Sequence, residues 1–268
     1  MMRSIEDTSI VFVGAGNLAA NLAHAFYRKG FRVAQIYSRT EESARTLAQV
    51  VEAEYTTNLE DVASDAQLYI VSLKDDALAE LLPQVVAGRE KGVWVHTSGS
   101  IPMDIWKGHV ERYGVFYPLQ TFSRNRLVDF REIPVFVEGS SDAEVQFLRQ
   151  IASALSGKAQ VADSEQRRNI HLAAVFTCNF ANHMYALGER LLQKNGLPFD
   201  ILLPLIDETA RKVHGLSPRS AQTGPAVRYD TGVIEKHLDM LADEPEMQRL
   251  YRLLSDDIHR MVQNPDIP

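Results

Sequence analysis

The sequence predicts an α/β fold, with a doubly wound parallel sheet in the first part of the chain and an all-helical second part. Through residue 163, short apolar runs of strand length alternate with segments in which apolar residues recur at helical spacing. From residue 164 onward the strand signals vanish and helical periodicity remains. The 268 residues suffice for two domains with a core each, so we expect domains at 1–163 and 164–268.

Composition and charge narrow the classes of function. A net charge of −7 provides no electrostatic footprint for nucleic acid or an anionic membrane. No apolar run approaches membrane-spanning length, and the first ten residues lack the apolar core of a signal peptide. The single cysteine, Cys178, excludes an internal disulfide and provides no metal cluster, so we expect a cytoplasmic protein without a metal site. We interpret Cys178 as a small buried apolar residue rather than a catalytic thiol.

The first strand, turn and helix form the most informative stretch. Ile10 to Val13 is an apolar run that breaks at Gly14-Ala15-Gly16 before helical spacing begins. Gly14 permits a tight turn, Gly16 lets the backbone approach a pyrophosphate, and Ala19 allows close packing of helix on strand. This pattern is typical of the Rossmann dinucleotide-binding fold, with the phosphates at the start of the helix; the alternative is a purely structural glycine turn. The cofactor-binding residues expected here are Gly14, Gly16, Asn17 and Leu18.

The second strand, at 31–37, ends in Ser38-Arg39-Thr40 and leads into a helix at 41–51. NAD enzymes place an acidic residue here for the ribose 2′-hydroxyl, and such an acid would repel a 2′-phosphate. Arg39 can instead pair with a phosphate, while Ser38 and Thr40 offer hydroxyl hydrogen bonds. The sequence therefore favours NADP over NAD as the cofactor. The alternative is that Arg39 is a solvated loop cation and that Thr40 caps the next helix.

The alternation of strand and helix continues to the end of the first part. Further strands are expected at 54–56, 68–72, 92–96, 134–137 and 159–161, a strand that runs into a turn over 114–122, and helices at 59–63, 76–86 and 142–155. Strand–helix–strand units imply a parallel sheet with right-handed crossovers.

Small polar residues follow two of these strands. Ser72 and Leu73 end the fourth strand, and the fifth ends in His96-Thr97-Ser98-Gly99-Ser100. In doubly wound sheets, ligands collect outside the carboxyl ends of the strands. We therefore expect Ser72, Leu73 and Ser98 to contact the cofactor and Ser100 to contact the substrate. Equally well, Ser98 and Ser100 cap the segment that begins at Ile101-Pro102.

A long helix over 165–194 opens the second part. Its apolar residues spread over most of the circumference, as in a helix buried on nearly all sides. Arg168, His171, Asn179 and Asn182 nevertheless fall on a narrow stripe, and buried polar groups need partners, a ligand or water. We expect the stripe to face a cleft, with His171 and Asn179 as catalytic residues and Asn182 against the substrate. The alternative for His171 is a hydrogen-bonded core histidine.

The remaining helices are expected at 199–213, 232–241 and 245–262. A loop at 223–230 is rich in turn-forming and polar residues, and here we expect Thr223 and Arg228 to bind a substrate carboxylate. Because an all-helical second domain often cannot cover its apolar faces alone, we expect a homodimer built through these helices.

Five motifs, in order along the chain, carry a resemblance to a known family. They are GAGNLA at 14–19, HTSGS at 96–100, YPLQTF at 117–122, HLAAVFTCNF at 171–180 and TGPAVRYD at 223–230. The chain resembles the Rossmann-like proteins with a C-terminal helical domain of unknown function, which are grouped with deazaflavin-dependent NADP oxidoreductases and pyrroline-5-carboxylate reductases in the 6-phosphogluconate dehydrogenase-like superfamily. The resemblance implies an NADP-binding N-terminal domain, an active cleft between the domains and dimerisation through helices. It implies no particular substrate.

Two positions depart from the pattern of these relatives. Hydroxyacid dehydrogenases of the superfamily carry a lysine followed four residues later by asparagine on the first helix of the second domain, whereas residues 167–182 contain no lysine. Tyr229 stands where the last motif of the family has glycine, a change that restricts the backbone and fills space.

The function expected from the sequence is an NADP-dependent oxidoreductase acting on a small carbonyl or imine substrate in the cleft between the domains. His171 would donate a proton or polarise the carbonyl, and Asn179 would orient the substrate. The missing lysine supports a second hypothesis, a nucleotide-binding sensor or scaffold without catalysis. A third hypothesis has another redox cofactor, such as a deazaflavin, as the hydride partner, although nothing in the sequence marks a flavin site.

Overall fold

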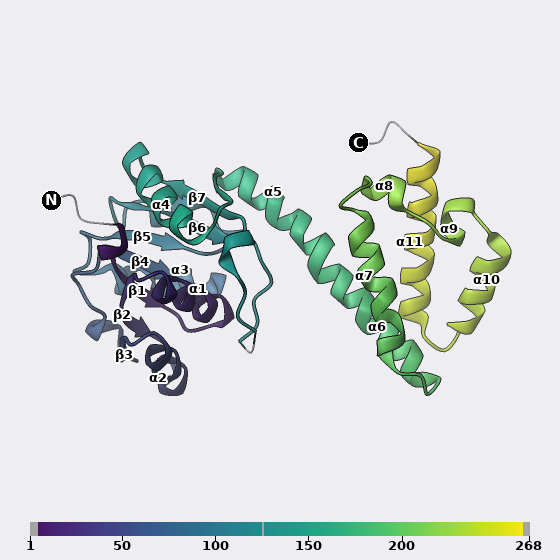
Figure 1. Cartoon of the computed structure of the whole chain (residues 1–268), viewed down its shortest axis with the longest axis horizontal. Coiled ribbons are helices and arrows are strands. Elements are labelled where there is room, and N and C mark those ends of the chain that lie inside the picture. Colours follow the sequence, from purple (N-terminus) through teal and green to yellow (C-terminus); the bar gives the residue numbers. More distant parts are fainter. Residues whose placement is uncertain (1–4, 125, 265–268) are drawn as a thin grey trace. The chain divides into compact units, whose positions relative to one another are not determined.

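The structure, a computed structural model, describes residues 5–124 and 126–264. The chain divides into two compact units, residues 1–178 and 179–268, and each is described by itself (Figure 1). The domain boundary expected near residue 163 remains a prediction.

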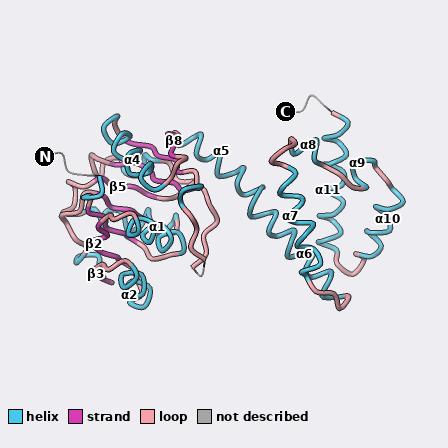
Figure 2. The backbone as a smooth tube through the Cα atoms, in the orientation of Figure 1, coloured by secondary structure: helices cyan, strands magenta, loops and turns pink. Residues whose placement is uncertain are grey.

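The first unit is built on an eight-stranded sheet in the order β3-β2-β1-β4-β5-β6-β7-β8. The strands of this unit are drawn in magenta in Figure 2. Neighbouring strands are parallel except for β6 and β7, which pair antiparallel. The predicted α/β architecture is therefore confirmed, as is each predicted strand. The strands are β1 (Ser9–Val13), β2 (Arg32–Tyr37), β3 (Glu54–Thr56), β4 (Leu68–Val71), β5 (Val93–His96), β6 (Tyr113–Pro118), β7 (Val135–Gly139) and β8 (Ala159–Val161).

Helices cover both faces of this sheet because its central strands are apolar on both sides. Ile10 and Phe12 of β1 face a core formed with α1 (Asn17–Arg28), α2 (Glu41–Val50) and α4 (Asp142–Leu155). Val11 and Val13 face the other core, formed with α3 (Asp75–Val86). Short 3₁₀ turns connect these elements at Ile5–Asp7, Leu59–Asp61, Met103–Trp106 and Phe130–Glu132.

The strand order reverses direction at β1, between β2 and β4. The connection from β1 runs to β2 on one side, whereas β3 leads back across the sheet to β4 on the other. Such a switch point leaves a crevice beyond the carboxyl ends of β1 and β4, where doubly wound folds bind their ligands.

All regular elements among the described residues of the second unit are helices, which confirms the predicted all-helical region. Its elements are α6 (Ala181–Lys194), a 3₁₀ turn (Phe199–Leu202), α7 (Leu203–Lys212), α8 (Pro218–Ala221), α9 (Pro225–Arg228), α10 (Thr231–Met240) and α11 (Pro245–Gln263). Within the described residues, no helix is long and apolar enough to cross a membrane.

The long predicted helix differs from expectation in two ways. It consists of α5 (Ser164–Ala174) and α6, joined by a π-helical segment at Val175–Phe180 that breaks the 100° spacing assumed for the polar stripe. None of the described residues of α6 is buried in the single chain, so the expectation of a helix buried on nearly all sides is wrong for the isolated chain. Cys178 is exposed, contrary to its interpretation as a buried residue.

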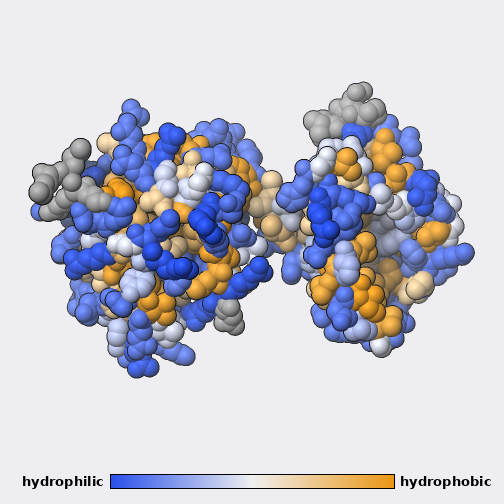
Figure 3. Space-filling model, viewed as in Figure 1, coloured by the Kyte–Doolittle hydropathy of each residue, from blue (hydrophilic) through white to orange (hydrophobic). Residues whose placement is uncertain are grey.

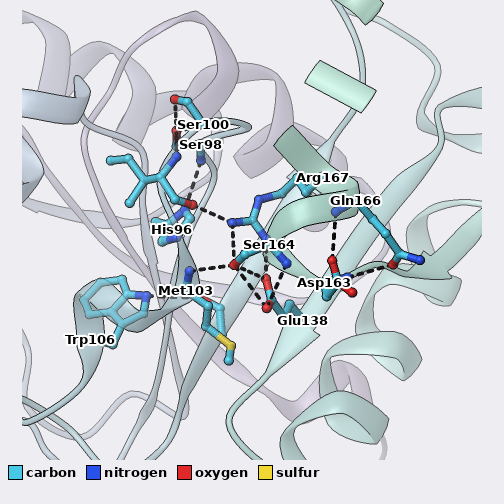
Figure 4. Close-up of polar contacts among 12 residues, drawn as sticks. His96, Ser98, Ser100, Met103, Trp106, Glu138, Asp163, Ser164, Gln166 and Arg167 are labelled. Carbon is cyan, nitrogen blue, oxygen red and sulfur yellow. Dashed lines mark hydrogen bonds and ion pairs between the residues drawn. The ribbon is translucent and has the colours of Figure 1, made fainter. Parts of the chain in front are cut away.

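Helix α5 is attached to the sheet by a buried ion pair. Arg167, 1% exposed, pairs through Nη1 with the carboxylate of Glu138 on β7 and donates from Nη2 to the carbonyl of Ile101 (Figure 4). Ser164 donates to the same carboxylate at 2.8 Å and accepts from the backbone of Met103 at 2.9 Å. Because both charges are removed from water, each depends on the other for solvation, and this fixes the start of α5.

Replacing Arg167 with methionine should destabilise the protein by about 3–5 kcal/mol, because Glu138 would be left as a nearly buried charge without its partner. The measurement is urea unfolding followed by circular dichroism. The exposed neighbour Arg168 provides the matched control, since Arg168→Met should change the free energy of unfolding by about 0.5 kcal/mol or less. Equal effects of the two substitutions would contradict the role given to the buried pair.

Candidate functional site

A cavity of about 350 Å³ opens at the switch point of the sheet, beyond the carboxyl ends of β1, β2 and β4. This volume lies within the range of about 300–1,000 Å³ that small-molecule sites occupy. The residues that line it are Gly14, Ala15, Gly16, Tyr37, Ser38, Arg39, Ser43, Ser72, Leu73, Lys74, Ala77, Leu81 and Arg124.

The glycine turn shapes one wall of this cavity. Gly14 has φ +116°, a conformation that L side chains rarely adopt, and a Cβ atom there would overlap the carbonyl oxygen of Ser72. At Gly16 an added Cβ atom would meet nothing within 4 Å, so this part of the backbone borders open space. The turn therefore brings β1 close to β4 and leaves an exposed stretch of backbone at the start of α1, as a bound pyrophosphate requires.

The charges around the cavity are of one sign. Arg39, Lys74 and Arg124 line it, and among the described lining residues there is no acidic side chain. Within the described chain, no carboxylate forms an ion pair with any of these three cations. Cations that converge on a cavity without protein counter-ions suit an anionic ligand, so these residues fit a phosphorylated dinucleotide.

The cavity brings together most of the residues expected to bind the cofactor: Gly14, Gly16, Ser38, Arg39, Ser72 and Leu73. The others lie outside its lining. Asn17 donates to the carbonyl of Phe122 at 3.2 Å, and Leu18 packs against the core. Thr40 precedes α2 as its N-cap residue, but its side chain makes no capping hydrogen bond.

Sequence reasoning missed Ser43, Lys74 and Arg124. Lys74 directly follows the expected pair Ser72-Leu73, and Ser43 lies on the first turn of the helix after Arg39, so proximity in sequence could have indicated both. Arg124 belongs to the connection between β6 and β7, and only the folded chain brings it to the cavity.

The polar residues after β5 form a local hydrogen-bonded turn. Ser98 Oγ accepts from the backbone of Ser100 and Ile101, both at 3.2 Å, and lies 3.0 Å from Ser100 Oγ. Ser100 Oγ in turn donates to Asp75 Oδ2 at 2.6 Å. Ser98 thus accepts from the backbone at the start of the segment, as the capping alternative expects, whereas Ser100 accepts no backbone hydrogen bond among the described residues, and the 3₁₀ turn at Met103–Trp106 has Pro102 as N-cap without a side-chain capping bond. Contact of either serine with a ligand remains a prediction. Toward the cavity, Ser72 and Thr97 approach through their hydroxyl oxygens at 3.1 Å.

His96 stabilises this turn through a hydrogen bond to its backbone. It is fully buried and stacks on Trp106, and its Nδ1 accepts from the backbone of Ser98 at 3.2 Å (Figure 4). Burial, reinforced by the nearby charge of Arg167, lowers the pKa of His96 to about 3. The ring is therefore neutral at physiological pH and acts as a structural acceptor rather than a proton donor.

His171, the expected catalytic residue, lies beside Tyr117 at the carboxyl end of β6. Its Nδ1 is 3.0 Å from Tyr117 Oη, and both side chains belong to the first unit. Gly99 makes room for the ring, because a Cβ atom there would lie 2.6 Å from Nδ1 of His171. Arg167, one turn before His171 on α5, fixes the helix that carries it.

The remaining expected site residues belong to the second unit. Asn179 lies in the π-helical segment and Asn182 on α6, and both are exposed. Thr223, two residues before α9, and Arg228, the last residue of α9, are also exposed. Tyr229 has φ +51°, the left-handed conformation that a glycine would adopt without strain, and its ring stacks on His259 at 4.1 Å. Within the described residues there is no group of side chains suited to hold a metal ion.

Comparison with known proteins reveals the family of the chain. Residues 9–95 match the family described as "NADP oxidoreductase coenzyme F420-dependent", and residues 133–258 match "Domain of unknown function (DUF2520)". No curated protein matches the chain. Among solved structures, an imine reductase from Myxococcus stipitatus in complex with NADP+ has 16% identity and a TM-score of 0.66, with 95% of this chain and 93% of that chain covered, which is a similarity of fold.

Two other solved structures extend over nearly the whole length. A protein from Thermotoga maritima is 24% identical, with a TM-score of 0.69, and the match covers 95% of this chain and 98% of the other. A protein from Bacteroides fragilis, described as a putative NADP oxidoreductase, is 67% identical, with a TM-score of 0.93 over 96% of this chain and all of the other. Since that identity extends along both units, the chain belongs to the family of NADP oxidoreductases that carry this C-terminal domain of unknown function.

Proposed function

We propose that this protein is an NADP-dependent oxidoreductase that transfers a hydride between the nicotinamide and the carbonyl or imine carbon of a small substrate. The observation that carries the proposal is the cavity at the switch point, bordered by the glycine turn and by three cations that form no ion pair with the described residues. Membership of the NADP oxidoreductases supports the cofactor. Imines join carbonyl compounds in the proposed substrate class because a protein of the same fold is an imine reductase in complex with NADP+.

Different residues of the chain would bind different parts of the cofactor and of the substrate. Gly14 and Gly16 would admit the pyrophosphate to the start of α1, and Ser38 with Arg39 would hold the 2′-phosphate. When bound, NADPH supplies the hydride. In the second unit, Asn179 and Asn182 would orient the substrate, with Thr223 and Arg228 reserved for a substrate carboxylate, as the sequence predicts. Ser100 retains its predicted role as a substrate contact.

The Tyr117–His171 pair would supply and receive the proton. Burial raises the pKa of Tyr117, so its hydroxyl keeps its hydrogen and can either donate to or accept from His171 Nδ1, according to the tautomer of the ring. In the imidazolium form both ring nitrogens carry hydrogen, and Nδ1 would donate to Tyr117 Oη. Nε2 would then release its proton to the substrate oxygen or nitrogen, which leaves a neutral ring that keeps its hydrogen on Nδ1.

The cofactor site is tested by fluorescence titration with NADPH and NADH. Arg39→Asp should weaken NADPH binding by about 10- to 100-fold, because a charged hydrogen bond is replaced by repulsion, and should shift the preference toward NADH. Arg45→Asp makes the same charge change at an exposed position of α2 outside the cavity and should leave the preference intact. If the unaltered protein binds neither nucleotide, the oxidoreductase proposal fails.

The proton-transfer pair is tested by NADPH oxidation with a panel of carbonyl and imine substrates and a deazaflavin. His171→Asn should lower kcat by about 100-fold or more, because general acid catalysis typically contributes about 10²- to 10⁴-fold, while the Kd for NADPH stays unchanged. His183→Gln alters an exposed histidine of α6 and serves as the control. Turnover of His171→Asn at the parent rate would remove His171 from the mechanism, and binding without turnover of any substrate would favour a sensor.

We also propose that the protein forms a homodimer through its C-terminal helices. Large apolar side chains remain exposed along the second unit of the single chain, as the orange patches of Figure 3 illustrate. Leu205 on α7 is 63% exposed, and contiguous exposed apolar residues of this kind typically mark an interface. The large apolar residues on and beside α7 that are exposed in the single chain are Leu197, Ile201, Leu203, Leu205, Val213 and Leu216.

The dimer is tested by light scattering coupled to size-exclusion chromatography. The unaltered protein should elute with twice the mass of the chain, and Leu205→Glu should shift it to the monomer because a charge cannot be buried unpaired in an apolar interface. Asp207→Ala, two residues further along the same helix, points in a different direction and should leave the dimer intact. A monomeric parent protein would contradict the proposal.

A further inference from the structure

The connection between β6 and β7 crosses α1 and is attached to it by two asparagines. Asn17 Nδ2 donates to the carbonyl of Phe122 at 3.2 Å, and Asn21 Nδ2 donates to the carbonyl of Ser123 at 3.1 Å. The oxygen of the Asn21 amide accepts from the backbone of Val128 at 3.2 Å, and Asn21 is only 2% exposed. One buried side chain thus holds both sides of the segment that carries Arg124.

Arg124 reaches from this segment into the cavity at the switch point. Its Nη2 donates to the carbonyl of Ala15 at 2.9 Å and to Ser43 Oγ at 3.2 Å. These bonds tie three distant parts of the chain together: the glycine turn, the first turn of α2 and the β6–β7 connection. The guanidinium is therefore oriented before any ligand binds, which reduces the entropy lost on binding.

The other donors of the Arg124 guanidinium bond to no protein group among the described residues. Its Nε and Nη1 make no hydrogen bond there, and no carboxylate pairs with it. Arg39, which lines the same cavity, likewise forms no ion pair within the described chain. Two guanidinium groups of like charge at one cavity repel each other, so an anion between them would relieve an unfavourable interaction.

We propose that Arg124 is a specificity-determining residue that binds the 2′-phosphate of the cofactor together with Arg39. The inference rests on the proposed NADP-dependent function and adds a residue from outside the strand–turn–helix unit that recognises dinucleotides. The bond to Ser43 indicates which part of the cofactor Arg124 would bind. Ser43 lies on the first turn of α2, four residues after Arg39, near the strand end where the fold recognises the adenosine ribose. On the side of the glycine turn, Arg124 is bonded to the carbonyl oxygen of Ala15. There the guanidinium meets the negative end of a protein dipole.

The test uses two fragments of the cofactor that differ by the phosphate in question. The affinities of 2′,5′-ADP and 5′-AMP are measured by isothermal titration calorimetry for the full chain and for Arg124→Ala and Arg124→Lys. Arg126→Ala is the matched control, because Arg126 belongs to the same exposed segment but does not line the cavity. Thermal unfolding of each variant checks that the fold is intact.

We expect Arg124→Ala to weaken 2′,5′-ADP by about 10- to 100-fold, as loss of a charged hydrogen bond to a phosphate does, and to weaken 5′-AMP by less than about 3-fold. Arg124→Lys should restore part of the affinity, because it keeps the charge but loses the planar guanidinium. Equal weakening of both fragments would assign Arg124 to the adenine or the 5′-phosphate and overturn the inference. Unchanged affinities would also overturn it.

The same binding measurements distinguish failure of this inference from failure of the proposed function. If the parent protein binds neither 2′,5′-ADP nor NADPH, the NADP-dependent function fails, and the 2′-phosphate role of Arg124 fails with it. If the parent protein binds both and Arg124→Ala matches it, the function stands and Arg39 reads the 2′-phosphate without Arg124.

Discussion

At Gly14 the chain passes so close to the carbonyl of Ser72 that no side chain fits between β1 and β4. This contact lies at the point where the strand order reverses, and it sets the width of the crevice beyond the two strands. Because Gly14 also needs a positive φ, both its conformation and its lack of a Cβ atom are required at one position. The cavity, its exposed backbone at Gly16 and the converging cations all depend on this approach.

A second close approach of two segments, at Gly99, determines the geometry around Tyr117 and His171. Gly99 leaves space for the ring of His171, whose Nδ1 then reaches Tyr117. This arrangement requires α5 to begin at a fixed place on the sheet, and the buried pair of Arg167 with Glu138 provides that attachment. The desolvation of both charges is unfavourable, so the pair contributes position rather than net stability. A charge pair without catalytic chemistry thus determines where the proposed proton donor lies.

Electrostatics distinguish the two regions of the site. Around the cavity, Arg39, Lys74 and Arg124 leave a positive field that an anionic cofactor would neutralise. Around Tyr117 and His171, burial dominates and keeps the phenol protonated. At a separate place, full burial lowers the pKa of His96 and makes it a neutral structural group. His171 differs from it in its surroundings, because it is only half-buried and contacts the hydroxyl of Tyr117.

The sequence alone determined the architecture and the nucleotide-binding turn. Apolar runs and helical periodicity follow directly from local side-chain patterning, so the strands from Ser9 to Val161 and the helical second part could be predicted, as could Gly14, Gly16, Ser38 and Arg39 at the cavity. Tertiary structure decided the contacts between segments far apart in sequence. No local pattern indicates that Arg124 reaches Ser43 or that Tyr117 meets His171, because these pairs form only when the sheet aligns its strand ends. The π-helical segment and the exposure of Cys178 likewise depend on packing, which an assumed ideal helix of 3.6 residues per turn does not contain.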